Sequence, residues 1–152
     1  MCIVYDMLKS AFLSISYENK NELSSEIDAI VNVFIKSNFS ILVFVREFLF
    51  LPGQEKEMME KALTEIEKCH VIIVEASVKA IGVGIEVGYA KALSKPIIYL
   101  RNYNSEKSTT LAGISNYIIT YSDINHLKNQ LREAVKDIKS KLSKNDKQLS
   151  KP

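Results

Sequence analysis

Four β-branched residues follow one another in the segment Val71-Ile72-Ile73-Val74. Successive side chains of a strand point to opposite faces of its sheet, so an unbroken apolar run leaves no face for water. Such strands are typical of parallel sheets that helices cover on both sides. We therefore predict that this segment is the central strand of an α/β domain.

Strand-like and helix-like segments alternate along the rest of the chain. Further strands are predicted at 11–16, 40–45, 96–100 and 117–121, and helices at 21–37, 55–68, 85–93 and from about residue 123. This alternation implies parallel pairing with right-handed crossovers, and we predict a three-layer, flavodoxin-like five-stranded parallel sheet. Ligands of such sheets bind beyond the carboxyl ends of the strands, which directs attention to the loops at 16–20, 75–84 and 101–110.

Length and composition fit a single globular domain, with 152 residues of which 47% are hydrophobic and 25% are charged. No apolar stretch has the length of a membrane helix and the first residues do not resemble a secretion signal, so we predict a cytoplasmic protein without membrane contact. Residues 139–152 hold five lysines and one aspartate. We predict a folded domain over residues 1–138 and a disordered, lysine-rich tail over 139–152. The rest of the chain carries a net charge of −2, so nucleic acid is not an expected partner, and a contact through the tail is the alternative.

The two cysteines, Cys2 and Cys69, are far apart and lack metal-ligand spacing. We expect neither a metal site nor a disulfide. The neighbouring pair Cys69-His70 leaves a reactive thiol open as an alternative, although packing at the start of a buried strand is the favoured interpretation.

The segment after the central strand combines glycines with an acid. Gly82 and Gly84 permit a ligand to approach the backbone closely, and Gly88 is expected to pack tightly on the sheet at a cost of about 1 kcal/mol in helix propensity. Glu86 falls in or near the first helical turn, where free amides and the helix dipole stabilise an anion. We therefore expect a low pKa for Glu86, which suits a nucleophile or an electrostatic stabiliser.

Two other interpretations of this segment remain open. Paired glycines at a helix start can cradle pyrophosphate, but the third glycine comes one position late and the motif follows the third strand, so the dinucleotide fingerprint is weak. Alternatively, the glycines form a tight turn and Glu86 caps backbone amides.

The segment Gly82-Val83-Gly84-Ile85-Glu86-Val87-Gly88-Tyr89-Ala90, together with residues 71–77 and 92–98, resembles the nucleoside 2-deoxyribosyltransferases and the related 2'-deoxynucleoside 5'-monophosphate N-hydrolases. The resemblance covers about residues 70–100. It implies a flavodoxin-like fold, a homodimer or higher homo-oligomer with composite sites, and cleavage of the N-glycosidic bond of a nucleoside or nucleotide substrate. Glu86 matches the catalytic glutamate, the nucleophile at C1' of the sugar. The implied scheme needs no metal and no organic cofactor.

The sequence departs from the family pattern at several positions. Ala62 stands where the hydrolases carry an acid that helps the base to leave, and Glu65, one turn further along, is the candidate replacement. The hydrolases hold phosphate with a glycine-rich first loop and with a serine where this chain has Ala80. The matching first loop here begins Ser16-Tyr17, so the sequence does not predict a 5'-phosphate pocket.

The remaining candidate substrate contacts lie in the three loops. Tyr17 and Asn19 suit a ribose or a base, although turn and capping roles explain them equally well. The full set of candidate substrate-binding residues is Ser16, Tyr17, Asn19, Ser77, Gly82, Gly84, Thr109 and Thr110. The last two lie in the loop from which, in the family, a neighbouring subunit sends a polar residue into the site.

We therefore predict an enzyme that cleaves or transfers at the N-glycosidic bond, with Glu86 as the nucleophile. The alternative is a module of the same fold that binds or senses a nucleotide without cleaving it, because the acid at position 62 is missing. A phosphoacceptor receiver domain is set aside, since the central strand ends in Val74-Glu75-Ala76 and not in an aspartate.

Overall fold

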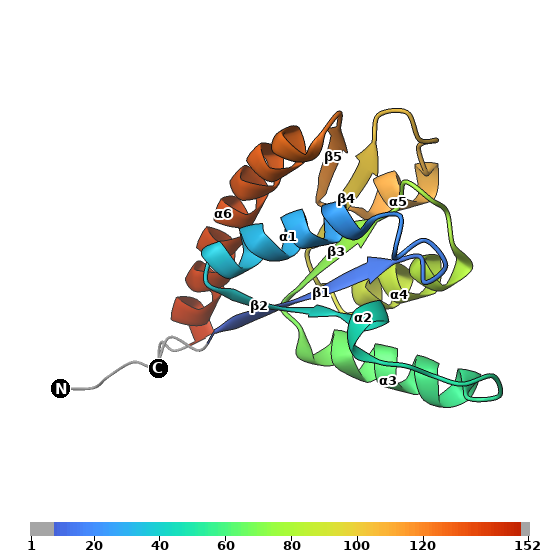
Figure 1. The fold of residues 1–152 in the computed structure, drawn as a ribbon. Helices are drawn as coiled ribbons and strands as arrows, with labels where there is room; N and C mark the ends of the chain where they lie inside the picture. Colours follow the sequence, from blue (N-terminus) through green and yellow to red (C-terminus); the bar gives the residue numbers. More distant parts are fainter. Residues whose placement is uncertain (1–7, 150–152) are drawn as a thin grey trace.

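The protein forms a five-stranded, all-parallel sheet in the computed structural model, which describes residues 8–149. The strands are β1 (Lys9–Ile15), β2 (Phe39–Val43), β3 (Val71–Glu75), β4 (Ile97–Asn102) and β5 (Tyr117–Tyr121). Their order is β2-β1-β3-β4-β5. β3 thus lies at the centre of the sheet, and the predicted flavodoxin-like arrangement is confirmed (Figure 1).

Helices cover both faces of the sheet (Figure 1). They are α1 (Ser24–Lys36), α2 (Phe44–Glu47), α3 (Glu55–Lys68), α4 (Ile81–Ala92), α5 (Thr109–Ile114) and α6 (Ile124–Leu149). α1 and α6 pack together on one face, whereas α3 and α4 cover the other. The short helices α2 and α5 were not predicted from the sequence. These layers leave the carboxyl ends of the strands as the edge at which loops meet.

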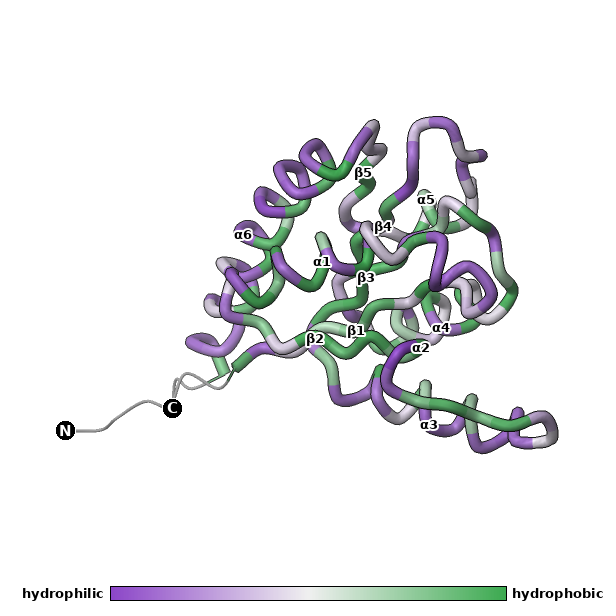
Figure 2. Tube along the Cα trace, viewed as in Figure 1, coloured by the Kyte–Doolittle hydropathy of each residue, from purple (hydrophilic) through white to green (hydrophobic). Residues whose placement is uncertain are grey.

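The side chains of β3 are divided between two hydrophobic cores. Val71 and Ile73 belong to the core under α1 and α6, and Ile72 and Val74 belong to the core under α3 and α4. All four are fully buried, and each such side chain contributes about 1.5–3 kcal/mol through the hydrophobic effect. Figure 2 shows the strands as apolar and the outer sides of α3 and α6 as polar. Between residues 8 and 149, no helix is both long enough and apolar enough to span a bilayer.

Helix α4 begins earlier than the sequence predicted, at Ile81 and not at residue 85. Ala80 has an extended backbone, and its carbonyl accepts a hydrogen bond from Gly84 N at 3.3 Å. Gly82 and Gly84 are therefore helical and do not form a turn before the helix. The earlier start moves Glu86 from the first turn of the helix to the second.

Helix α6 continues to Leu149, so the segment from residue 139 is helical where we expected a disordered tail. Leu142 packs against the core, and the Lys139 ammonium donates a hydrogen bond to Ser37 O at 3.1 Å. Lys139 thus helps to anchor this helix, whereas Lys141, Lys144 and Lys147 lie on its exposed side. Residues 150–152 lie outside the described part of the chain.

Candidate active site

A cleft of about 760 Å³ opens at the carboxyl end of the sheet. The loop after β1, the segment from α2 to α3, and the start of α4 form its walls. The chain runs from β1 to β2 on one side and continues with β3 on the other, so the strand order reverses next to β1. The cleft therefore lies at the position where ligands of such sheets bind.

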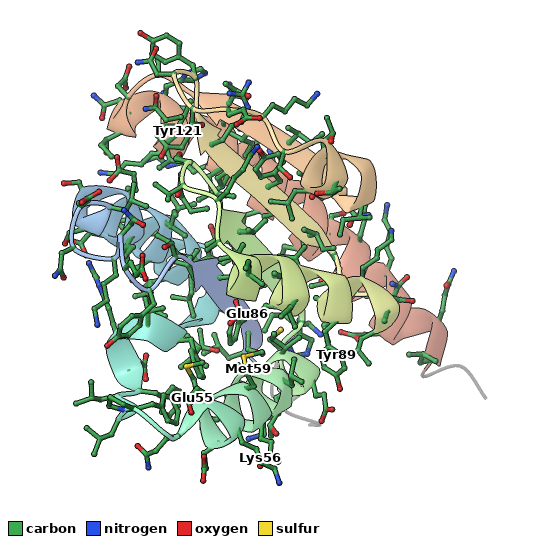
Figure 3. The ribbon with its side chains drawn as sticks, turned by 90° about the vertical axis from the view of Figure 1, so that its right-hand side faces the viewer. Glu55, Lys56, Met59, Glu86, Tyr89 and Tyr121 are labelled. Atoms are coloured by element: carbon green, nitrogen blue, oxygen red, sulfur yellow. The ribbon has the colours of Figure 1, made fainter. Side chains whose placement is uncertain are left out.

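Glu86 reaches this cleft from the second turn of α4. Its carboxylate accepts a hydrogen bond from the hydroxyl of Ser14, a buried residue of β1. Figure 3 shows Glu86 on the side of α4 that faces α3, where Glu55 and Met59 lie below it. The structure thus places one carboxyl group at the inner end of the cleft, between a helix and the sheet.

Burial raises the pKa of Glu86 to about 7, and the hydrogen bond from Ser14 offsets only part of this rise. Our prediction of a low pKa was wrong. The helix dipole acts mainly on the terminal turn, and Glu86 lies beyond it because α4 begins at Ile81. Desolvation disfavours the charged form and is the dominant effect here.

Sequence reasoning missed Ser14, the partner of Glu86. A polar residue inside the apolar stretch of residues 11–15 was the available signal, because it needs a hydrogen-bonding partner once it is buried. Ser14 lies 72 positions before Glu86, and parallel pairing of β1 with β3 brings the two together.

Three of the predicted polar residues, Ser16, Tyr17 and Asn19, line the cleft. The Ser16 hydroxyl donates to Asn19 Oδ1 at 2.9 Å, which fixes the turn after β1. Tyr17 is half exposed, and the Lys20 ammonium lies 4.1 Å from the centre of its ring. Asn19 Nδ2 in turn donates to the Glu22 carboxylate at 3.1 Å, so Tyr17 is the exposed one of these three side chains.

The opposite side of the cleft is apolar and was not anticipated from the sequence. Three phenylalanines form its centre, with ring centroids 5.0 Å apart for Phe44 and Phe48 and 6.0 Å apart for Phe44 and Phe50. Met58 and Met59 of α3 extend this wall. Aromatic and thioether groups of this kind suit a planar ligand.

The structure brings Ala62 to the cleft but does not bring Glu65 there. The Glu65 carboxylate forms ion pairs with Lys61 at 2.9 Å and with Lys68 at 3.1 Å. Hydrogen bonds from these two lysines lower the pKa of Glu65. Within one chain, Glu65 therefore lies outside the cleft that Ala62 lines. Two other acids, Glu18 and Glu55, do line the cleft.

The predicted substrate contacts of the other two loops are separated from one another. Gly82 lines the cleft, whereas Gly84 and Thr110 line a smaller hollow of about 300 Å³ beside α5. Thr109 lines neither, and Ser77 is engaged in a buried hydrogen-bond network. Within a single chain, Gly82 therefore shares the cleft with Glu86, whereas Ser77, Gly84, Thr109 and Thr110 do not line it.

Gly88 does not pack tightly on the sheet as we expected. It is exposed on α4, and a Cβ atom added there would meet nothing within 4 Å. The same open space surrounds Gly82, so its backbone is accessible to a ligand in the cleft.

The alternative of a reactive thiol at Cys69 is not supported. Burial raises the pKa of the Cys69 thiol to about 11, and its sulfur donates a hydrogen bond to Ile66 O at 3.1 Å. His70 does not bond this thiol: its Nδ1 accepts from Ser10 N at 3.0 Å. Cys2 lies outside the described residues. Within residues 8–149, no group of three His, Cys, Asp or Glu side chains could hold a metal ion.

The fold is shared with solved structures of known enzymes. CMP N-glycosidase BcmB from Clostridium botulinum is 22% identical, with a TM-score of 0.59, and the match covers 81% of this chain and 98% of that one. A 2-deoxyribosyltransferase from Bacillus psychrosaccharolyticus is 13% identical, with a TM-score of 0.64, and the match covers 83% of this chain and 95% of that one. Both neighbours are of the nucleoside 2-deoxyribosyltransferase-like family, so the resemblance found in the sequence is found again in the fold.

Other comparisons limit what the fold alone implies. No protein-family model matches the chain, and no curated protein matches it in sequence. The NanR protein of Vibrio vulnificus, solved in complex with ManNAc-6P, is 12% identical with a TM-score of 0.50, and the match covers 95% of this chain and 56% of that one. Because one fold serves several functions, the function must be argued from the site.

Proposed function

We propose that the protein cleaves or transfers at the N-glycosidic bond of a nucleoside or nucleotide, with Glu86 as the nucleophile. The observation that carries this proposal is the position of the partly buried Glu86 carboxyl group at the inner end of the cleft, where it accepts a hydrogen bond from Ser14. The two fold neighbours named above, an N-glycosidase and a deoxyribosyltransferase, act on bonds of this kind.

The dimensions and lining of the cleft suit such a substrate. A volume of about 760 Å³ lies within the range of small-molecule sites. The phenylalanine wall offers a surface on which a base stacks, and base stacking on an aromatic side chain is worth about 1–3 kcal/mol. On the other side, Tyr17 is half exposed and offers a hydroxyl group to a sugar.

The chemistry follows from the position of the carboxylate. The bond between C1' and the base nitrogen breaks, the electron pair leaves with the base, and the sugar passes through an oxocarbenium-like state. The ionised Glu86 attacks C1' and forms a glycosyl ester. In hydrolysis, water attacks C1', the ester bond to Glu86 breaks to restore the carboxylate, and the proton released by the water goes to the departed base. In transfer, the nitrogen of a second base attacks C1' in place of water and loses its proton. This scheme uses no metal and no organic cofactor.

The raised pKa gives the nucleophile a pH dependence. At about pH 7 half of the Glu86 groups are ionised, and the ionised form is the one that attacks. The nucleophile role thus implies that activity increases as the pH rises through about 7.

The test is to incubate the protein with mixed deoxynucleosides, nucleotides and free bases and to follow the products by mass spectrometry. Glu86→Gln is expected to abolish release and exchange of the base, while Glu133→Gln, an exposed acid of α6, retains both. A wild-type protein that releases and exchanges no base across the panel refutes the enzymatic proposal.

The replacement of the family acid by Ala62 favours a second candidate, a module that binds nucleotides without cleaving them. Such a module would gain thermal stability from a nucleoside or nucleotide and yield no product. The same panel, read by thermal shift and by mass spectrometry, separates the two functions.

We also propose that the chain forms a homodimer or a higher homo-oligomer through the outer side of α4. Ile81 and Ile85 of this helix are 86% and 52% exposed, beside the open Gly84 and Gly88. Large exposed apolar side chains that gather on one surface mark interaction sites. Light scattering of the wild type and of Ile85→Lys tests this assembly, which predicts a smaller particle for the variant.

A further inference from the structure

Glu75 is a buried acid that the proposed chemistry does not use. It ends β3 and is fully buried. Its side chain follows Val71 and Ile73 toward the core under α1 and α6, on the opposite face of the sheet from Glu86. A buried carboxyl group destabilises the folded state unless it is hydrogen-bonded. The residues that bond Glu75 therefore indicate what this side chain does.

Three donors converge on the Glu75 carboxyl group. Ser77 donates from its backbone N at 3.3 Å and from its hydroxyl, and the Tyr121 hydroxyl donates at 2.9 Å. The Ser77 hydroxyl oxygen also accepts from Asn102 N at 2.7 Å. This network joins the ends of β3, β4 and β5 to the loop that follows β3.

The loop after β3 leads directly into the cleft. Ala76 N still donates to Leu100 O at 3.0 Å, which continues the pairing of the sheet. After Ala76, the next backbone N–H with a backbone acceptor in the described residues is that of Gly84, which donates to Ala80 O just before α4. Between these two points, Val78 and Lys79 line the cleft. Lys79 also forms an exposed ion pair with Glu106 at 2.8 Å, so Ser77 is the buried anchor of this wall and Lys79 a solvent-exposed one.

We propose that Glu75 is a positioning residue that holds the loop of residues 76–80, and with it one wall of the cleft, in the shape that binds substrate. Ser77 and Tyr121 together donate three hydrogen bonds to position 75. A carboxyl group can accept all three, and an aliphatic side chain can accept none. Figure 3 shows Tyr121 apart from Glu86, so this network does not contact the reacting atoms. The substrate-binding part of this inference rests on the proposed function.

Tyr121→Phe tests the proposal, because it removes one donor and keeps the ring. The matched control is Tyr117→Phe on the same strand, whose hydroxyl donates to Asp137 of α6 at 2.5 Å, away from the loop. Each variant removes one hydroxyl with its contacts: Tyr121 also lies 3.4 Å from the Ser77 hydroxyl, and Tyr117 also accepts from the Lys141 ammonium at 3.2 Å. Glu75→Gln changes the acceptor itself and is the stronger perturbation of this network. It is measured as well if the variant protein folds.

The first measurement is amide hydrogen exchange of the peptide covering residues 77–84. Tyr121→Phe is expected to accelerate this exchange about fivefold, and Tyr117→Phe to leave it unchanged. Equal exchange in the two variants overturns the proposal, whether or not the protein is an enzyme.

The second measurement is the steady-state kinetics of base release. Tyr121→Phe is expected to raise KM about fivefold and to change kcat less than twofold, because Glu86 and Ser14 stay in place. A fall in kcat with an unchanged KM overturns the positioning role. If the wild type shows no turnover, the proposed function fails, and the exchange measurement still decides whether Glu75 holds the loop.

Discussion

Replacing Glu86 with glutamine tests whether this carboxyl group is desolvated, because glutamine keeps the shape and removes the charge. The Ser14 hydroxyl can still donate to the oxygen of the new amide. The variant therefore differs from the wild type mainly in its titration.

The size of the effect follows from the pKa in the two states. The Glu86 pKa is 4.5 in the unfolded chain and about 7 in the folded protein. Each pKa unit is worth 1.36 kcal/mol, so the difference corresponds to about 3 kcal/mol. Between these two values the folded state holds a proton that the unfolded state has released. Stability from this group is thus fully present below pH 4.5 and is lost as the pH rises through about 7.

The free energy of unfolding is measured by urea denaturation, followed by far-ultraviolet circular dichroism, at several pH values from 4.5 to 8. We expect the free energy of unfolding of Glu86→Gln, relative to that of the wild type, to increase by about 3 kcal/mol from pH 4.5 to 8. Burial also raises the pKa of Glu75, but Glu75 is present in both proteins and cancels in the difference. Glu133→Gln, at an exposed position of α6, is the control for removing one carboxyl group outside the cleft.

A difference between Glu86→Gln and the wild type that changes by less than about 1 kcal/mol between pH 4.5 and 8 would refute the reasoning. It would mean that water reaches the carboxylate in the folded protein, and the raised pKa would no longer support a desolvated nucleophile.

Three further predictions concern the cleft and the core. Ser14→Ala removes a hydrogen bond that lowers the pKa of Glu86, so the midpoint of the pH profile of kcat/KM should move above about 7; an unchanged midpoint contradicts the role of Ser14. Phe48→Ala should weaken nucleoside binding by about 1–3 kcal/mol in calorimetric titration, and an equal Kd would exclude stacking on this wall. Leu131→Ala, at a fully buried position of α6, should lower the urea unfolding free energy by about 2–5 kcal/mol, and a loss below 1 kcal/mol would show that α6 is not part of the core.

The course of α6 illustrates a limit of local sequence patterns. From Lys139 onward the composition resembles a solvated tail, yet the helix continues to Leu149. The apolar spacing that ends in Leu142 was visible in the sequence, but the anchoring of Lys139 to Ser37 joins segments that are far apart in the chain. Composition alone does not reveal such contacts.

The sequence by itself determined the fold class and the residue on which the proposal rests. The periods of strands and helices are local properties, so β3 and the central sheet could be predicted from the run at Val71, and Glu86 was identified from its own neighbours. Only the tertiary structure decided the pKa of Glu86, its partner Ser14 and the phenylalanine wall around Phe48. Desolvation depends on which distant segments exclude water from a group, and these are brought together only when the sheet and its helices pack.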